Sequence, residues 1–140
     1  MLRQFLVVGG ASLVNITIHA LVMTMVVGVA KTASLRKIQH PSLFLIGVMI
    51  PTASILMATH ALEVIVWSLT YSMVDAAPAD ANLVYFAFVN YTTLGYGDVI
   101  PVERWRLLGP MTAMNGVLLF GWSTAVIFEV LRKALALDRR

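Results

Sequence analysis

Charge is what this sequence lacks most: only 12% of its 140 residues are Asp, Glu, Lys or Arg, whereas 59% are hydrophobic. Soluble domains carry about 25% charged residues. A soluble fold with this composition would have too few polar side chains to cover its surface. Hydrocarbon lipid as the surrounding solvent removes that difficulty, so the composition predicts a chain that lies mostly within a membrane.

Cysteine is absent, which excludes disulfides, thiolate metal sites and cysteine nucleophiles. Clustered positive charge is absent too, because the net charge is only +3 and the basic residues lie in loops and at the C-terminal tail. Nucleic-acid binding is not expected, since it needs a basic face. No hydrophobic segment carries regularly spaced arginines, so no voltage-sensing helix is expected.

Three hydrophobic stretches are long enough to cross a bilayer, which takes roughly 20 apolar residues in a helix. Residues 4–30 and 107–128 contain no formally charged side chain, and residues 41–74 are interrupted only by His60 and Glu63. The sequence therefore predicts an all-α membrane protein with three transmembrane helices.

The first stretch also has features of a secretory signal peptide, because it begins Met-Leu-Arg and has small residues near Ala30. Its apolar region is too long for that interpretation. Cleavage would also leave the basic loop 31–40 on the outer side of the membrane. We therefore favour a first transmembrane helix over a cleaved leader.

Lysine and arginine are distributed unequally between the two sides that three spans define. One side receives Lys31, Arg36, Lys37, Arg132, Lys133, Arg139 and Arg140, and the other receives Arg3, Arg104 and Arg106. Basic residues concentrate on the cytoplasmic side of membrane proteins. We therefore expect a multi-pass protein of the cell membrane with its N-terminus outside and its C-terminus in the cytoplasm.

A different kind of segment, residues 80–101, lies between the second and third stretches. Asp80 and Asn82 are good helix N-caps, and the apolar run that follows, 83–89, is too short to cross a bilayer. The glycines of the next stretch, Thr-Thr-Leu-Gly-Tyr-Gly-Asp at 92–98, would end a helix. This order predicts a re-entrant loop, which survives at membrane depth only when it is buried in protein or lines a water-filled path.

The stretch 92–98 resembles the selectivity filter of potassium channels, whose TVGYG loops replace the hydration shell of the ion with rings of backbone carbonyls. Leu94 stands in place of the usual Val, and the resemblance extends from about residue 80 to 133. It implies a potassium-channel pore with an extra N-terminal transmembrane helix. The implied regions are an N-terminal part, 1–40, and a pore domain, 41–140, with an outer helix at about 41–74, a pore helix at about 81–92, a filter at 93–98 and an inner helix at about 105–133.

The residue types of this stretch suit a dehydrated monovalent cation. Backbone carbonyls are neutral dipoles that hold such an ion without trapping it. Aiming successive carbonyls at one axis takes alternating backbone conformations, which Gly95 and Gly97 allow and other L-residues resist. By the resemblance, K⁺ is bound by carbonyls of Thr93, Leu94, Gly95 and Tyr96, by the Thr93 hydroxyl, and at the outer mouth by Gly97.

One chain offers one oxygen at each level of such a filter, so the resemblance implies a homotetramer around a central pore. K⁺ is then the permeant ion, membrane lipids surround the assembly, and no cofactor is expected. The side chains of Leu94 and Tyr96 should point away from the pore axis and pack against the pore helix.

Residues around the filter have expected roles that follow from the same resemblance. Tyr85 and Phe86 occupy positions where the family carries aromatics that brace the filter, with plain core packing as an equal alternative. Tyr85 is also placed to hydrogen-bond Asp98, and Thr92 supports the start of the filter. Val89 stands where many relatives have a carboxylate, so one possible brace is missing.

Acidic residues on the outer side would raise the local cation concentration at a pore entrance. For two of them, Asp75 and Asp80, plain solvation is the favoured explanation, whereas Asp98 belongs to the motif. The acidic residues of this side are Asp75, Asp80, Asp98 and Glu103.

Glycines in the third helix are candidates for a gate, because the family gates by flexing its inner helix. Gly116 and Gly121 would permit bending, and the matched register implies that Leu118, Gly121 and Ala125 face the cavity. Small residues in membrane helices more often serve close packing. We favour packing for Gly116 and leave both explanations open for Gly121.

His60 and Glu63 form an intramembrane polar pair on one helix face, with Trp67 one turn further on. Ionisable residues inside a span are candidates for function. We favour structural anchoring, with Glu63 bonded to the buried end of the pore helix near Asn90, over pH sensing. A metal site would need ligands beyond this pair, and no second cluster of Glu or His supplies them. His19, alone in the first span, is expected to be an interhelical hydrogen-bond donor.

Three other functions compete with a potassium-selective channel. A weakly selective cation channel would use a similar loop, and the intact Gly-Tyr-Gly-Asp argues against it while Leu94 leaves it open. A membrane enzyme using His60 and Glu63 as acid and base would lack a nucleophile. A small accessory subunit would have no use for a filter-like loop.

Overall fold

A computed structural model describes residues 1–33 and 41–136. They form, in order, α1 (Leu2–Ala33), α2 (Pro41–Val74), α3 (Leu83–Tyr91), the 3-10 turn η1 (Glu103–Trp105) and α4 (Leu108–Ala136). The described residues contain no strand, and three helical segments are long and apolar enough to cross a membrane. The prediction of an all-α chain with three potential spans is confirmed.

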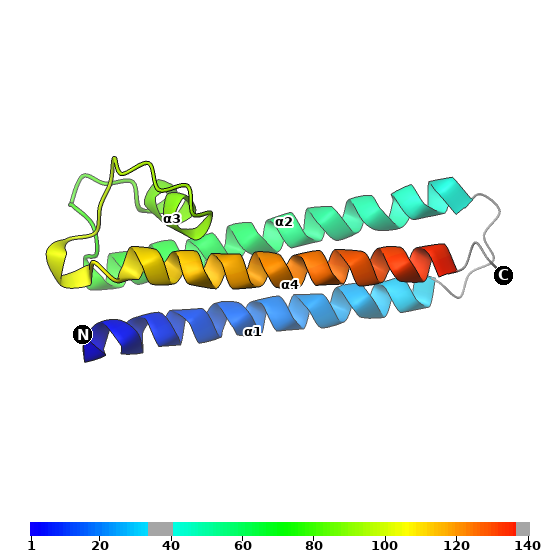
Figure 1. The fold of residues 1–140 in the computed structure, drawn as a ribbon, viewed down its shortest axis with the longest axis horizontal. Coiled ribbons are helices and arrows are strands. Elements are labelled where there is room, and N and C mark those ends of the chain that lie inside the picture. The colour runs from blue at the N-terminus through cyan, green and yellow to red at the C-terminus, as the bar shows by residue number, and fades with distance from the viewer. Residues whose placement is uncertain (34–40, 137–140) are drawn as a thin grey trace.

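The three long helices lie side by side, with α1 and α4 running in one direction and α2 in the other (Figure 1). Met1, α3 and the loop from Thr92 to η1 lie at one end of this bundle. The C-terminal end of α4 lies at the opposite end. The short α3 and its loop occupy only the first end, which is the arrangement expected of a re-entrant segment (Figure 1). Four of the basic residues used to predict orientation, Arg36, Lys37, Arg139 and Arg140, lie outside the described residues.

The start of α1 is fixed against η1 by side-chain contacts. Gln4 Nε2 donates to the Arg104 carbonyl at 2.7 Å, and the Leu107 backbone N–H donates to Gln4 Oε1 at 3.2 Å. The Arg3 guanidinium lies 5.5 Å from the centre of the Trp105 ring. These contacts explain why α1 begins before the predicted residue 4 and why the first helix packs as part of the bundle.

Prolines are placed where the helices tolerate them. Pro110 lies in the first turn of α4, where a backbone N–H would have no helical partner. Pro51 lies inside α2, which continues through it, as membrane helices often do. The fourth helix begins at Leu108 rather than near residue 105, because Glu103 to Trp105 form a separate 3-10 turn with Trp105 buried.

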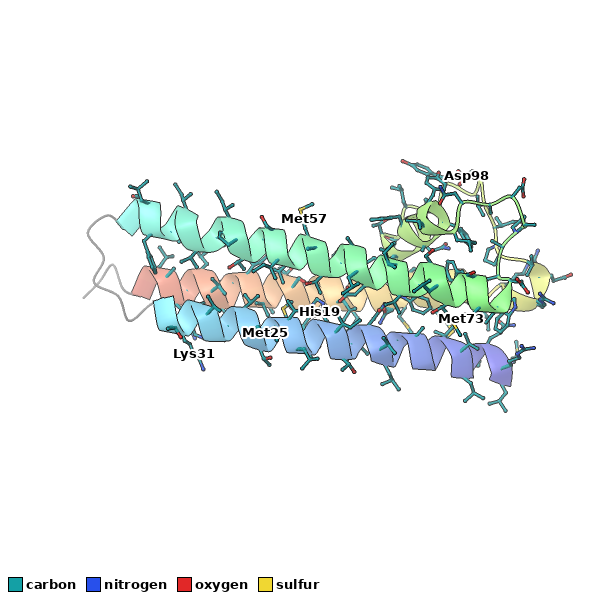
Figure 2. The ribbon with its side chains drawn as sticks, turned by 180° about the vertical axis from the view of Figure 1, so that it is seen from behind. His19, Met25, Lys31, Met57, Met73 and Asp98 are labelled. Atoms are coloured by element: carbon teal, nitrogen blue, oxygen red, sulfur yellow. The ribbon has the colours of Figure 1, made fainter. Side chains whose placement is uncertain are left out.

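Much of the outer surface is apolar, as lipid contact requires. Met57 points away from the bundle in Figure 2 and is 76% exposed. Leu6, Met25 and Met73 are likewise exposed in the single chain. In water these side chains would favour aggregation, whereas in a bilayer or against another subunit they are compatible with a stable fold.

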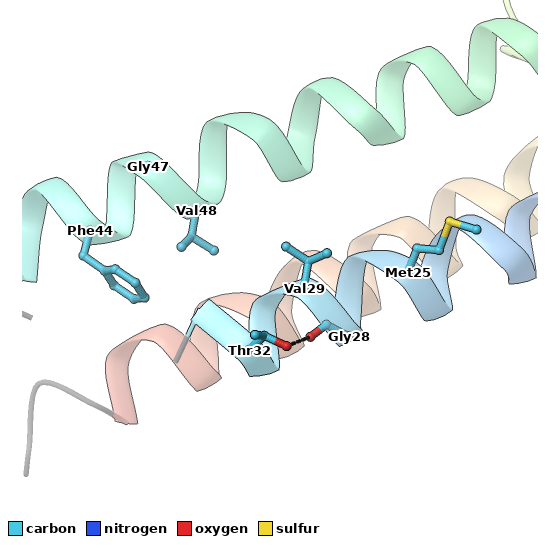
Figure 3. Close-up of a pocket in the computed structure, with 7 residues that line it drawn as sticks. All are labelled: Met25, Gly28, Val29, Thr32, Phe44, Gly47 and Val48. Carbon is cyan, nitrogen blue, oxygen red and sulfur yellow. Dashed lines mark hydrogen bonds between the residues drawn. The ribbon is translucent and has the colours of Figure 1, made fainter. Parts of the chain in front are cut away.

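A crevice of about 850 Å³ opens between α1 and α2 at the end of the bundle away from α3 (Figure 3). Its lining residues are Met25, Gly28, Val29, Thr32, Phe44, Gly47 and Val48. None of them is ionisable, and the Thr32 hydroxyl is satisfied by the Gly28 carbonyl at 3.2 Å. The crevice is therefore not a candidate for chemistry.

Candidate functional site

The loop that follows α3 has an alternating backbone. Thr93, Gly95 and Gly97 have φ of +61°, +59° and +77°, whereas Leu94 and Tyr96 between them are not in the positive region. Positive φ is accessible to glycine at little cost, but at Thr93 it stores strain of about 1–3 kcal/mol. Such strain persists only when the surroundings hold it, which makes this loop a candidate functional site.

In the stretch 93–97 of the loop after α3, backbone N–H groups make hydrogen bonds whereas the carbonyls, within the described residues, do not. The N–H groups of Thr93 and Leu94 donate back to the end of α3, to Asn90 O at 3.0 Å and Val89 O at 2.9 Å, and Gly95 N–H reaches Val89 O at 3.4 Å. Within the described part of the chain, the carbonyls of residues 93–97 accept no hydrogen bond. Their oxygens are therefore free to coordinate something from outside the chain.

Local contacts hold α3 so that it presents this loop. Asn82 caps its start by accepting the Tyr85 backbone N–H at 3.1 Å, which selects Asn82 from the two predicted caps. At the other end, Tyr91 lies directly against α4. A Cβ added to Gly116 would overlap the Tyr91 carbonyl oxygen and lie 3.0 Å from its carbonyl carbon. Only glycine at 116 allows this approach.

The hydrogen bond expected between Tyr85 and Asp98 is present, with the hydroxyl donating to Asp98 Oδ2 at 2.6 Å. The other carboxylate oxygen accepts the Val99 backbone N–H at 3.0 Å. The Tyr85 hydroxyl holds the pKa of Asp98 below its usual range. Asp98 is thus kept ionised while it ties the returning end of the loop to α3.

Replacing Tyr85 by Phe should raise the pKa of Asp98. The lowered pKa reflects stabilisation of the carboxylate by the hydroxyl, and this stabilisation is lost as pH falls through that pKa. Without the hydroxyl, protonation of Asp98 begins at higher pH. A carbon NMR titration of the Asp98 carboxyl in the whole protein measures the change.

The matched control for this titration is Asp75→Asn, because Asp75 is exposed and makes only a 4.0 Å ion pair with Arg104. That variant should leave the Asp98 titration where it is. If Tyr85→Phe also leaves it unchanged, the bond does not govern the charge of Asp98.

The expected filter packing of Leu94 and Tyr96 is not met within one chain, and Phe86 takes one of its two expected roles. Leu94 and Tyr96 were expected to pack against the pore helix, but they are 54% and 66% exposed. For Phe86, bracing of the filter and plain core packing were equal alternatives, and it is buried against Tyr71, with ring centres 5.1 Å apart. Phe86 therefore packs in the core between α2 and α3, whereas no described part of the chain covers Leu94 and Tyr96.

The α4 residues assigned to a cavity share one surface. Leu118, Gly121 and Ala125 are all exposed in the single chain, and a Cβ on Gly121 would meet no atom within 4 Å. Gly116 differs, because it is buried against Tyr91. The face bearing residues 118, 121 and 125 is thus left uncovered by the other helices of the chain.

A buried polar cluster lies where all four α-helices meet. Glu63 is fully buried; its Oε1 lies 2.8 Å from His19 Nδ1, and its Oε2 lies 3.0 Å from His60 Nδ1 and accepts a hydrogen bond from Tyr91. His60 Nε2 lies 2.9 Å from Ser123 Oγ. We call these five residues, His19, His60, Glu63, Tyr91 and Ser123, the four-helix node.

The sequence identified His60 and Glu63 as a pair but did not connect them to the other members of the node. Glu63 binds the hydroxyl of Tyr91, one residue beyond the expected Asn90. Asn90 instead donates to the Tyr71 hydroxyl at 3.3 Å. Polar residues inside apolar spans, such as His19 and Ser123, were the available signal, because buried polar groups in lipid need partners.

A second polar network next to the node was also missed. Trp67 Nε1 donates to Asn115 Oδ1 at 3.1 Å, and Asn15 Nδ2 lies 3.3 Å from the same oxygen. Tyr71 donates to Thr112 Oγ1 at 2.7 Å. These bonds join α1, α2 and α4 in a region where lipid offers no alternative partners.

The three potential spans define a multi-pass membrane protein, and the loop after α3 combines a strained backbone with carbonyls that are unbonded within the described residues. A family model described as an ion channel matches residues 55–133, more than half of the chain. The chain belongs to this ion-channel family, which implies a transport protein rather than an enzyme. Comparisons with curated proteins and with solved structures give no match.

Proposed function

We propose that this chain is one subunit of a potassium-selective channel that assembles as a homotetramer. The observation that supports it best is the loop at 93–97, where φ alternates in sign and the carbonyls have no partner within the described residues. Alternating φ lets successive peptide planes turn their oxygens to the same side. Such a row of neutral dipoles can replace the water around a monovalent cation.

Four chains are needed because each contributes one oxygen to each level of the filter. The binding levels would be formed by the carbonyls of residues 93–96 and the Thr93 hydroxyl, with Gly97 at the mouth. The exposed Leu94 and Tyr96 side chains would then be covered by the neighbouring subunit. An ion channel of this family is expected to be oligomeric, and a tetramer is the assembly that fits a single loop per chain.

Two electrostatic features favour cations along this path. The C-terminal end of α3, near Tyr91, carries partial negative charge from the helix dipole. Asp98 stays ionised beside the loop because the Tyr85 hydroxyl lowers its pKa. The exposed α4 face with Leu118, Gly121 and Ala125 would line the cavity below the filter.

The proposed orientation has Met1 and the filter loop outside and the C-terminus in the cytoplasm. Met1 and the loop after α3 lie at the end of the bundle opposite the last described turn of α4 (Figure 1). The distribution of Lys and Arg supplies the direction. The first helix, outside the family match, would act as an extra helix that packs on α2 and α4 of its own subunit.

Cation flux through the purified protein in liposomes tests the proposal. We expect potassium to move and sodium to be largely excluded under the same gradient. Equal flux of the two ions would favour the weakly selective cation channel instead. Empty liposomes give the background against which both ions are compared.

A further inference from the structure

The four-helix node carries a buried negative group whose neutralisation must come from nearby. Glu63 is fully buried, and among the described residues His19, His60 and Tyr91 contact its carboxylate oxygens. A buried charge is expensive unless it is paired or coordinates a metal. Positive charge can reach this carboxylate in two ways: as a proton on an imidazole, or as a metal ion between the rings.

The orientation of the two imidazoles favours a metal ion. Both place Nδ1 beside the Glu63 carboxylate, at 2.8 Å for His19 and 3.0 Å for His60, and His60 Nδ1 also lies 2.8 Å from the Tyr91 hydroxyl. Both turn Nε2 toward one hydroxyl, Ser123 Oγ, at 2.9 Å for His60 and 3.4 Å for His19. Histidines that bind metals use one ring nitrogen as the ligand and give the N–H of the other to a partner that fixes the ring.

We propose that His19, His60 and Glu63 form an intramembrane site for a divalent transition-metal ion such as Zn²⁺. Their ligand atoms already lie within 4.8 Å of one another. Tetrahedral zinc with bonds of about 2.0 Å places its ligand atoms roughly 3.3 Å apart. The two imidazoles must come closer to each other by rotamer adjustment. The distance from each ring nitrogen to the Glu63 carboxylate needs to change only slightly.

The remaining positions of such a site have partners at hand. Tyr91 keeps its hydrogen bond to the carboxylate, and a water molecule can complete four-coordination, as in other sites with two histidines and one glutamate. Asn15, one helical turn before His19, has a buried Oδ1 without a hydrogen-bond partner in the described residues. His60 is the least enclosed ligand, with 13% of its side chain exposed, so the ion enters on its side.

Metal binding would join α1 to α2 and, through Tyr91, to the end of α3 that bears the filter loop. It goes beyond ion conduction, because the site is complete within one chain and its occupancy does not depend on the permeant ion. The expected consequence is a folded state that is more resistant to heat when the metal is present.

Binding of Co²⁺ and Zn²⁺ to the tag-free, full-length protein in detergent tests this site. We expect one Co²⁺ per chain with the visible absorption of a tetrahedral ion, displaced by Zn²⁺. His19→Gln and His60→Gln should each lower the affinity at least tenfold. His40→Gln, which changes the remaining histidine and lies outside the described residues, is the matched control and should bind as the original does.

Ser123→Ala keeps all three ligands and removes only the partner of their outer nitrogens, so we expect it to fold and to bind about 10-fold to 100-fold more weakly. If the histidine variants fail to fold, the metal affinity of Ser123→Ala still tests the site. Absence of any bound metal, or affinity unchanged in His19→Gln, His60→Gln and Ser123→Ala, would overturn the proposal and leave the node as a proton-paired network.

Discussion

Replacing Gly95 by Ala is expected to reduce potassium flux to the liposome background while the protein stays folded. Gly95 has φ of +59°, and a Cβ there would meet only Thr93 O, at an ordinary 3.9 Å. The penalty is therefore conformational, about 1–2 kcal/mol for an L-residue in this region, repeated in each subunit. The loop relieves it by leaving the alternating conformation, which turns carbonyls away from the ion path. Flux and thermal unfolding, measured on the same preparation, separate this effect from misfolding.

Two further variants serve as controls for the Gly95→Ala measurement. Gly10→Ala changes an exposed glycine in the first half of α1, where no atom lies within 4 Å of the new Cβ, and it should conduct normally. D-alanine at position 95 adds the same methyl group but favours positive φ, so it should restore flux. Normal conduction by the L-alanine variant would show that the backbone at 95 does not need the left-handed region.

Replacing Gly116 by Ala is expected to destabilise the whole protein rather than the ion path alone. The new Cβ would overlap the backbone carbonyl of Tyr91, and backbone cannot move aside as a flexible side chain can. Overpacking of this kind costs roughly 1–3 kcal/mol or more. We expect a lower melting temperature in detergent and loss of flux, because α3 must move away from α4 and its loop moves with it.

Gly121→Ala provides the comparison within the same helix. Its added Cβ has no neighbour within 4 Å, so the melting temperature should stay that of the original protein. Equal destabilisation by the two substitutions would mean that both reflect the properties of the helix rather than contact with Tyr91.

Sequence reasoning succeeded where a local pattern carries the information. Apolar runs predicted the three potential spans, because their length is set by the thickness of the bilayer. The succession of an Asn cap, a short apolar run and paired glycines predicted α3 and the turn after it. The bond between Tyr85 and Asp98 was expected because Asp98 belongs to the 92–98 motif and Tyr85 occupies a position where the family carries bracing aromatics.

The arrangement of the long helices was beyond such reasoning. Helices surrounded by lipid are apolar on nearly every side, so their sequences do not show which face meets a neighbour. The contact of His19 with Glu63, 44 residues away, depends on how α1 and α2 are rotated about their axes. The sequence therefore showed no further Glu or His cluster beside His60 and Glu63, because nothing in it places His19 of the first span next to Glu63.

The packing of Leu94 and Tyr96 was missed for a different reason. Both side chains are exposed in the isolated chain, and the expected cover would be provided by another subunit. If these two side chains pack only in an assembly, the contacts within one chain cannot show that packing. The exposed side chains are for this reason the part of the loop that most directly supports an oligomer.

The reversal potential under bi-ionic conditions tests the central claim most directly. The purified protein is placed in a planar bilayer with potassium on one side and sodium at equal concentration on the other. The account predicts a reversal potential far from zero, with the sign that marks potassium as the permeant ion. Current that reverses near zero voltage would contradict it, because the carbonyl loop would then conduct both ions alike.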